Sequence, residues 1–333
     1  MNILTVPLYQ SRAVRWLVWL ALIVFGVYRL VFMPSILNAT TDNGFDLTNS
    51  EIDTRKIEHG GPPKDGIPAL DSPRFTSPQD ATFLREDDWV IGLEIEGDAR
   101  AYPVKILNYH EIVNDRIGTL GVLISYCPLC RTAMAFDSSN QGMPLSFGVS
   151  GLLYNSDVLM YDRQTESLWS QIMGRAISGP LKGSELNTIP IMHTTWTDWL
   201  RRYPDTRVLS TNTGHSRRYG VDPYASYRGS NRIMFSVDKL DKRYHKKEFV
   251  IGLKRGGVSK VWPFSELETT WEDEPGKEYL EDRVNGEVVR VYFNPGKRSA
   301  RITDATGRLL DGLSAYWFAW VAFHPDTEVF TAD

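Results

Sequence analysis

Apolar residues in the body of the chain alternate with polar ones or form short runs, as is typical of β-strands. The stretches WVIGLEI and RAYPVKI lie on either side of Glu96-Gly97-Asp98, three residues that favour a turn. Two further β-rich stretches, TLGVLISY and RTAMAF, flank a Cys-Pro-Leu-Cys sequence at 127–130. The pattern predicts a body of mainly antiparallel β-structure.

Helical spacing of aromatic residues is confined to short stretches. In TWTDWLRRY, Trp196 and Trp199 stand three positions apart, which places them on one helical face, and Pro204 ends the stretch. Trp317 and Trp320 have the same spacing near the end of the chain. We therefore expect an α+β fold, mainly antiparallel β, in which one short helix closes each of two β-rich units.

Two parts of the chain match each other in colinear order. The sequence VIGL at 90–93 recurs at 250–253, and Trp-x-x-Trp followed by Pro-Asp-Thr occurs at 196–206 and again at 317–327. Such self-similarity predicts an internal duplication. The expected division is a first repeat over 81–210 with an insertion at 138–195, a connection over 211–246 and a second repeat over 247–333.

The first 80 residues differ in composition from the rest. Residues 16–37 are almost wholly apolar except for Arg29, and they follow Arg12 and Arg15 without an acidic residue before them. This length suits a transmembrane helix, whereas the uninterrupted part, 16–28, has the length of a signal-peptide core. The poor cleavage pattern favours an uncleaved anchor. The expected order is a cytoplasmic N-terminus over 1–15, a transmembrane anchor over 16–37 and an extended, polar linker over 38–80.

Basic residues that precede an apolar segment stay in the cytoplasm, so the rest of the chain is expected outside it. The predicted location is the bacterial inner (plasma) membrane, with a single pass and an exported C-terminal domain. The membrane is then the expected partner, together with an unidentified membrane protein. Nucleic acid is not expected, because 37 basic residues against 41 acidic ones give a net charge of −4.

The two cysteines of the chain, Cys127 and Cys130, are the sharpest chemical feature. A Cys-x-x-Cys turn can bring two sulfurs within disulfide distance or onto one soft metal ion. Arg131 follows where covalent haem attachment requires His. The second repeat has Asn-Pro-Gly-Lys at the equivalent 294–297, so the turn itself does not need sulfur. A metal site is favoured, and a redox pair or a static disulfide stay open.

Further metal ligands would come from elsewhere in the first repeat. The candidates are His110, the adjacent Glu111, Met134 and His193. Two thiolates with His and Met suit copper(I), whereas two thiolates with His and a carboxylate or water suit zinc. Copper is therefore the predicted cofactor and zinc the alternative. Each of these side chains could instead simply pack in the core or cap a turn.

The surplus segment of the first repeat, FGVSGLLYNSDVLMYDRQTESLWSQ, contains several polar groups suited to chemistry. Its acids could serve as acid or base, and its neutral polar groups could position a substrate. The alternative is a polar strand rim with no chemical role. No GxSxG, HExxH, P-loop or GxGxxG motif occurs, so whether the protein is an enzyme stays open. The candidates are Asp157 and Asp162 for catalysis, and Tyr154, Asn155, Ser170 and Gln171 for substrate binding.

Four long segments resemble a family of bacterial and archaeal proteins of unknown function, domain-of-unknown-function family 3179. They are GDARAYPVKILNYHEIVND, SYCPLCRTAMAFD, the surplus segment quoted above and WFAWVAFHPDTEV. The resemblance extends from about residue 80 to the end of the body. It implies an exported domain with CPLC and YNSDVLMYDRQT among its signatures, and it implies no established activity.

The leading hypothesis is a membrane-anchored protein facing the periplasm, whose copper-leaning Cys-x-x-Cys site serves metal handling or metal-dependent redox chemistry. One alternative is a thiol–disulfide oxidoreductase, which requires an accessible cysteine of low pKa. The other is a non-enzymatic interaction module in which the cysteines form a structural disulfide.

Overall fold

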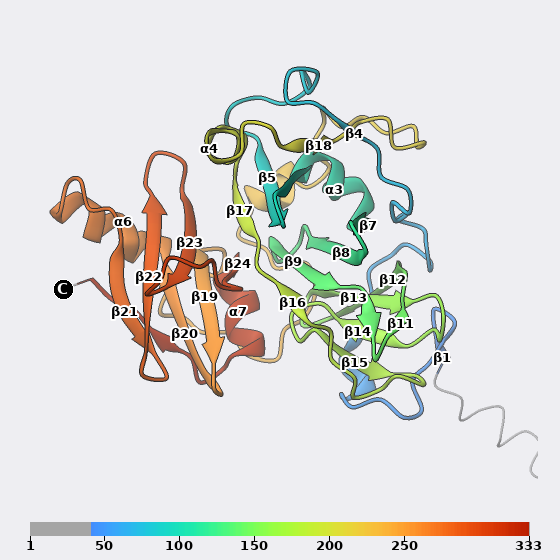
Figure 1. The fold of residues 1–333 in the computed structure, drawn as a ribbon. Coiled ribbons are helices and arrows are strands. Elements are labelled where there is room, and N and C mark those ends of the chain that lie inside the picture. The colour runs from blue at the N-terminus through green and yellow to red at the C-terminus, as the bar shows by residue number, and fades with distance from the viewer. Residues whose placement is uncertain (1–40, 333) are drawn as a thin grey trace, which may run out of the picture.

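The structure is a computed structural model that describes residues 41–332, and most of its strands belong to five sheets (Figure 1). Three of the sheets come from the chain before residue 210. In spatial order, the first contains β15 (Arg175–Ser178), β14 (Leu168–Ser170), β13 (Asp157–Asp162), β12 (Phe147–Tyr154) and β3 (Ile57–His59). The second contains β16 (Thr188–Ile189), β9 (Thr132–Asp137), β8 (Leu120–Cys127) and β7 (Ile112–Ile117). The third contains β17 (Met192–Thr195), β5 (Trp89–Ile95), β6 (Asp98–Pro103), β18 (Arg207–Leu209) and β4 (Phe75–Thr76).

The other two sheets come from the last third of the chain and lie together on one side of the molecule in Figure 1. One contains β24 (Leu313–Tyr316), β19 (Phe249–Arg255), β20 (Val258–Pro263) and β25 (Glu328–Val329), and the other contains β21 (Leu280–Val284), β22 (Glu287–Asn294) and β23 (Ser299–Asp304). Two small ribbons are β1 (Thr41–Asp42) with β2 (Phe45–Asp46), and β10 (Ser139–Asn140) with β11 (Met143–Pro144).

Helices are few and short. They connect strands rather than form a layer of their own (Figure 1). The helices are η2 (Thr54–Lys56, a 3₁₀ turn), α3 (Val104–His110), α4 (Trp196–Arg202), α5 (Ala225–Arg228), α6 (Phe264–Asp273) and α7 (Trp317–Phe323). The mostly β architecture of five small sheets resembles a five-bladed β-propeller.

Tight turns account for the local strand pairing. Glu96 and Gly97 both have positive φ, 53° and 87°, and they join β5 to β6. Asn285 and Gly286 join β21 to β22 in the same way, with φ of 48° and 79°. Two consecutive residues in this conformation form the turn whose twist matches an antiparallel hairpin.

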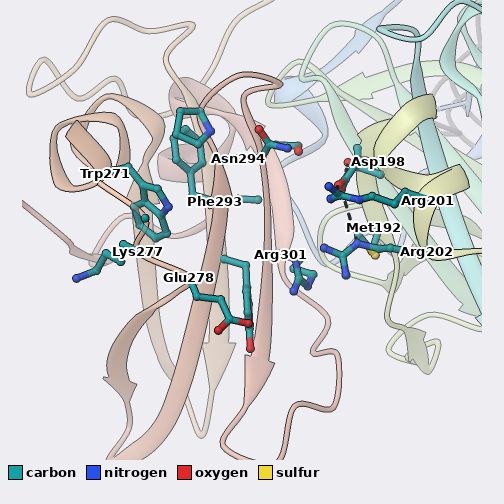
Figure 2. Close-up of a pocket in the computed structure, with 16 residues that line it drawn as sticks. Met192, Asp198, Arg201, Arg202, Trp271, Lys277, Glu278, Phe293, Asn294 and Arg301 are labelled. Carbon is teal, nitrogen blue, oxygen red and sulfur yellow. Dashed lines mark hydrogen bonds and ion pairs between the residues drawn. The ribbon is translucent and has the colours of Figure 1, made fainter. Parts of the chain in front are cut away.

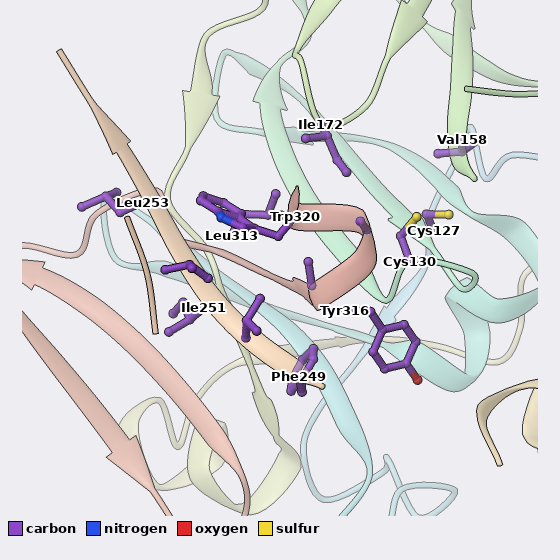
Figure 3. Packing of buried hydrophobic residues seen from close by; sticks show 14 of the residues in the cluster. Cys127, Cys130, Val158, Ile172, Phe249, Ile251, Leu253, Leu313, Tyr316 and Trp320 are labelled. Carbon is purple, nitrogen blue, oxygen red and sulfur yellow. The ribbon is translucent and has the colours of Figure 1, made fainter. Parts of the chain in front are cut away.

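The largest hydrophobic core runs across several sheets. It includes both cysteines of the CPLC turn and also Phe249 of β19, Tyr316 of β24 and Trp320 of α7. Figure 3 shows the cysteines beside Val158, in the same cluster as these aromatic residues from the far end of the sequence. The CPLC turn therefore lies inside the molecule, where distant parts of the chain meet.

The expected α+β class with two duplicated units is wrong. The described chain forms five mostly antiparallel sheets, and two of the three sheets in its first part are built largely from β7–β9 and β12–β15. The matching sequences correspond to local likenesses, such as Val90 paired with Pro103 and Val250 paired with Pro263. Likewise, Trp199 packs on Gly92, as Trp320 packs on Gly252. The matching sequences thus belong to two sheets with a similar strand order, β17-β5-β6-β18 and β24-β19-β20-β25, but these are two of five sheets, so the described chain does not divide into two units.

The expected membrane location also has to be corrected. Among residues 41–332, no helix has the length and apolar character needed to cross a bilayer. The anchor expected at 16–37, and the N-terminus before it, lie outside the described residues. The single-pass inner-membrane location that was built on this anchor is therefore unsupported. Part of the segment expected to be a linker, β3, pairs with β12.

Candidate metal centre

The hairpin that joins β8 to β9 positions the two cysteines. Cys127 pairs with Thr132, so four residues, 128–131, make the connection. Arg131 ends the connection in the left-handed conformation, with φ of 56°. Both thiols are free, and both cysteines are buried, Cys127 at 1% and Cys130 at 0% exposure.

A second turn, between β12 and β13, meets the first. Its two central residues, Asn155 and Ser156, both have positive φ, 52° and 64°, which is common for Asn but costly for Ser. The Asn155 side chain accepts a hydrogen bond from the backbone of Asp238 at 2.7 Å and so fixes the turn from outside. The turn directs the Ser156 carbonyl oxygen at the sulfurs, 3.1 Å from Cys130 Sγ and 3.8 Å from Cys127 Sγ.

Asp157, the first residue of β13, completes the cluster. One sulfur from Cys127, one from Cys130 and a carboxylate oxygen of Asp157 lie within 4.8 Å of one another. All three side chains are buried. Three ligand atoms at this spacing, two of them soft sulfurs, could hold a transition metal ion.

A buried hydrogen-bond network fixes the orientation of the Asp157 carboxylate. Thr132 Oγ1 lies 3.2 Å from one carboxylate oxygen, and the backbone N–H of Ile172 donates to the other at 3.2 Å. Thr132 also donates to Gln171 at 2.6 Å, and Gln171 donates in turn to Ser125 at 3.0 Å. Groups that support ligands in this way are what a metal site needs to keep its geometry.

Burial favours the neutral forms of the acidic groups in and beside this cluster. Burial raises the pKa of Asp157 to about 7, and it raises the pKa of the Cys130 thiol well above its usual range. Burial, with a smaller effect from the Asp157 charge, also raises the pKa of Glu111 to about 8. Acids kept neutral by burial ionise when a metal ion supplies the compensating charge.

The two histidines expected as ligands lie elsewhere. His110 is fully buried, and its ring nitrogens bond the Pro68 carbonyl at 2.7 Å and the Tyr219 hydroxyl at 2.6 Å. His193 lies on β17, edge-on to Trp89, and both its ring nitrogens lack a hydrogen-bond partner within residues 41–332. Neither belongs to the group of converging ligand atoms. Met134 lies on β9 and packs against the large core.

The residues expected in catalysis and substrate binding are spread along one sheet. Asp157 belongs to the cluster, whereas Asp162, at the other end of β13, accepts a hydrogen bond from Trp169 Nε1 at 2.9 Å and organises the following turn. Tyr154 donates to Asp238 at 3.3 Å at the surface side of the turn. Asn155 fixes the turn that contains Ser156, and Gln171 accepts the hydrogen bond from Thr132. The Ser170 hydroxyl is buried and has no partner in the described chain.

The comparison with family models now identifies the chain. Residues 64–327 match the model described as "Protein of unknown function (DUF3179)". The chain belongs to this family. This confirms the resemblance found in the sequence. No curated protein and no solved structure matched the DUF3179 protein.

Sequence reasoning missed two groups in this DUF3179 protein, Thr132 and the Ser156 carbonyl. Thr132 stands directly opposite Cys127 in the β8–β9 pairing, so a four-residue hairpin drawn on the sequence would have placed it beside the sulfur. The position of Ser156 depends on contact between two turns about 25 residues apart in sequence. No local pattern carries that information.

One cavity of the described molecule lies away from the cysteines. It encloses about 600 Å³ between α4 and β17 on one side and β22 and β23 on the other. Figure 2 shows Arg201, Arg202 and Asp198 on one wall and Arg301 on the other. Asp198 pairs with Arg201 at 2.5 Å and lies 3.8 Å from Arg202. The positive charge of Arg201 is therefore already neutralised.

Proposed function

We propose that this DUF3179 protein is a metal-binding protein that holds a transition metal ion, zinc as first choice, through Cys127, Cys130 and Asp157. The observation that carries the proposal is the convergence of their three ligand atoms within 4.8 Å inside the core. Two turns from different sheets meet to form this group. A chance cluster of this kind would leave two thiols and a carboxyl buried together at a cost in solvation.

The burial of the cysteines favours metal binding over thiol–disulfide exchange. A reactive cysteine is partly exposed and has a lowered pKa, because the thiolate is the attacking species. Here burial raises the pKa of Cys130, and neither sulfur is accessible. A metal ion deprotonates coordinating thiols directly, so burial is no obstacle to that role.

The third ligand decides between the two metals that sulfur favours. The preference for copper rested on His and Met joining the two thiolates, but His110 and His193 make other contacts. A carboxylate as third ligand suits zinc, which accepts sulfur, nitrogen and oxygen donors. The Ser156 carbonyl, 3.1 Å from Cys130 Sγ, is in place as a further oxygen donor. Copper(I), which two thiolates alone can bind, is the second candidate.

Metal titration of the full-length protein tests this proposal. After removal of metal under reducing conditions, we expect about one zinc ion per chain to bind, and cobalt(II) to give sulfur-to-cobalt charge-transfer bands. Asp157→Asn should weaken zinc binding by about tenfold or more, in line with the loss of a ligand or its support. Asp137→Asn, at the far end of β9 and half-buried, is the matched control and should bind zinc normally.

Copper(I) titration of the same variants separates the two metals. If Asp157→Asn leaves copper(I) binding intact and wild-type copper(I) binding outcompetes zinc, the site is a two-sulfur copper site. Failure of the wild-type protein to bind either ion would refute a metal-binding function.

A further inference from the structure

A second cavity lies directly beside the CPLC turn. It encloses about 430 Å³, which is within the range of small-molecule sites. Arg131, the residue after Cys130, lines it, and so does Tyr316, whose backbone N–H donates to the Cys130 carbonyl at 2.9 Å. The opposite wall comes from the ends of β19 and the β22–β23 hairpin. Its lining comprises Trp89, Arg131, Arg228, Lys247, Glu248, Phe249, Gly296, Lys297, Arg298 and Tyr316.

Positive charge dominates this lining. Five of its side chains are basic and one, Glu248, is acidic. Arg228 pairs with Asp222, and Arg298 pairs with Glu268 at 3.0 Å. In the described part of the chain, Arg131, Lys247 and Lys297 have no carboxylate within ion-pair distance. The cavity therefore brings together three basic side chains that no acidic side chain neutralises.

The Arg131 side chain is held in place by aromatic rings. Its guanidinium carbon lies 4.4 Å from the centre of the Trp89 ring and 4.3 Å from that of Phe249. Contacts of this kind use the face of the guanidinium and leave the N–H groups at its edge free to donate. Arg131 also ends the CPLC turn, and its backbone there has the left-handed conformation. The turn and the two rings thus present a fixed, planar hydrogen-bond donor.

Lys247 supplies a second fixed positive charge. Its ammonium donates to the carbonyls of Tyr227 and Ser230, the latter at 2.9 Å, and lies 3.4 Å from the centre of the Tyr227 ring. An ammonium has three N–H donors, so one remains for another acceptor. Lys297 is half-buried on the hairpin across the cavity.

We propose that this cavity binds a small organic anion, whose carboxylate or phosphate group meets the edge of Arg131 and the ammonium groups of Lys247 and Lys297. A planar guanidinium matches both oxyanions with two parallel hydrogen bonds. The aromatic walls suit an apolar portion of the same molecule. The proposal does not depend on a metal at the cysteines.

Calorimetric titration of the full-length protein with two probes, inorganic phosphate and benzoate, tests the site. We expect saturable binding of one of them at low ionic strength, weakened by added chloride as expected for a charged site. The stronger probe identifies phosphate esters or carboxylates as the ligand class. Arg131→Gln should weaken that binding about tenfold or more, since it removes charge-assisted hydrogen bonds.

Two further variants keep the test decisive. Lys297→Gln changes a half-buried residue of the same cavity and should weaken binding several-fold even if Arg131→Gln fails to fold. Arg201→Gln changes a side chain of the cavity between α4 and β22–β23, where Asp198 already neutralises Arg201, and should bind the probe normally. Absence of saturable binding to the wild-type protein, or equal losses in Arg201→Gln and Lys297→Gln, would overturn the proposal.

Discussion

Two hairpins of this protein have nearly the same backbone and different chemistry. In β8–β9, Cys127 pairs with Thr132, and in β22–β23, Asn294 pairs with Ser299, so each connection has four residues. Each connection begins with Pro and ends with Arg in the left-handed conformation. One hairpin buries two sulfurs, whereas the other places a half-buried lysine, Lys297, at the rim of a cavity.

The comparison teaches that the turn does not require its cysteines. The difference lies in what packs against each hairpin. The β12–β13 turn brings Asp157 and the Ser156 carbonyl to the CPLC sulfurs. At the other hairpin, Lys297 and its neighbours face a cavity instead. The sulfurs are therefore present where a carboxylate meets them, as expected of ligands rather than of residues needed for folding.

The largest expected effect comes from removing the sulfurs. The double variant Cys127→Ser, Cys130→Ser should lose zinc binding altogether, because a hydroxyl does not replace a thiolate as a zinc ligand. Zinc titration with a competing chromophoric chelator measures this loss. The metal-free double variant should still fold cooperatively, since Asn294 and Lys297 occupy the equivalent positions of a folded hairpin.

The matched control alters the other hairpin in the same way. Asn294→Ser with Lys297→Ser should bind zinc like the wild-type protein. Unchanged zinc affinity in the cysteine double variant would show that the two cysteines are not zinc ligands. Collapse of its fold without metal would instead make the cysteines structural.

The next effect concerns Glu111, a buried acid close enough to Asp157 to feel its charge. Its pKa rises from an ordinary 4.5 to about 8 on folding, so the folded state holds its proton more tightly than the unfolded state. The corresponding stability is fully present below pH 4.5 and is lost as the pH rises towards about 8. When the pH is raised from 5 to 8.5 without metal, the free energy of unfolding should fall by about 2–4 kcal/mol less in Glu111→Gln than in the wild-type protein.

Urea denaturation at the two pH values measures the effect of Glu111→Gln. Some decline should persist in the variant, because burial also raises the pKa of Asp157 to about 7. Glu287→Gln, at an exposed position on β22, is the control and should follow the wild-type curve. Parallel pH profiles for wild type and Glu111→Gln would show that folding does not raise the pKa of Glu111.

Local features of this protein could be predicted from the sequence. Alternating apolar residues around Glu96 and Gly97 predicted a hairpin, and the structure has one there. Cys127, Cys130 and Asp157 were candidates because of their chemistry, and the structure brings them together. These successes share a cause, since strand alternation, turn residues and donor type are properties of short segments.

The arrangement of sheets could not be predicted in this way. β3 pairs with β12 across about 90 residues, and nothing in either segment specifies the other. The repeated sequences form two similarly ordered sheets, but they specify nothing about the other three sheets, so a division into two units did not follow from them. His110 looked like a ligand by type alone, but its partners, Pro68 and Tyr219, are distant in sequence. Which polar group satisfies a buried histidine is decided by long-range packing.

The smallest expected effect contrasts the two arginines that end the hairpins. Both have positive φ, 56° for Arg131 and 47° for Arg298, where glycine is the preferred residue. Replacement by glycine removes about 1–2 kcal/mol of backbone strain but costs roughly 0.5–1 kcal/mol in chain entropy. Any difference in the free energy of unfolding between Arg131→Gly and Arg298→Gly then comes from the contacts of the two arginine side chains. Denaturant unfolding of both variants, at one pH and without metal, measures that difference.

Arg298 is exposed, and its ion pair with Glu268 is worth little in water, so Arg298→Gly should stay within about 0.5 kcal/mol of the wild-type stability. Arg131 packs its guanidinium against Trp89 and Phe249, so Arg131→Gly should lose about 2 kcal/mol from the missing cation–π contacts and packing. Equal stabilities for the two variants would mean that the aromatic contacts of Arg131 contribute nothing to folding. In that case the rings would serve only to orient the guanidinium towards the cavity.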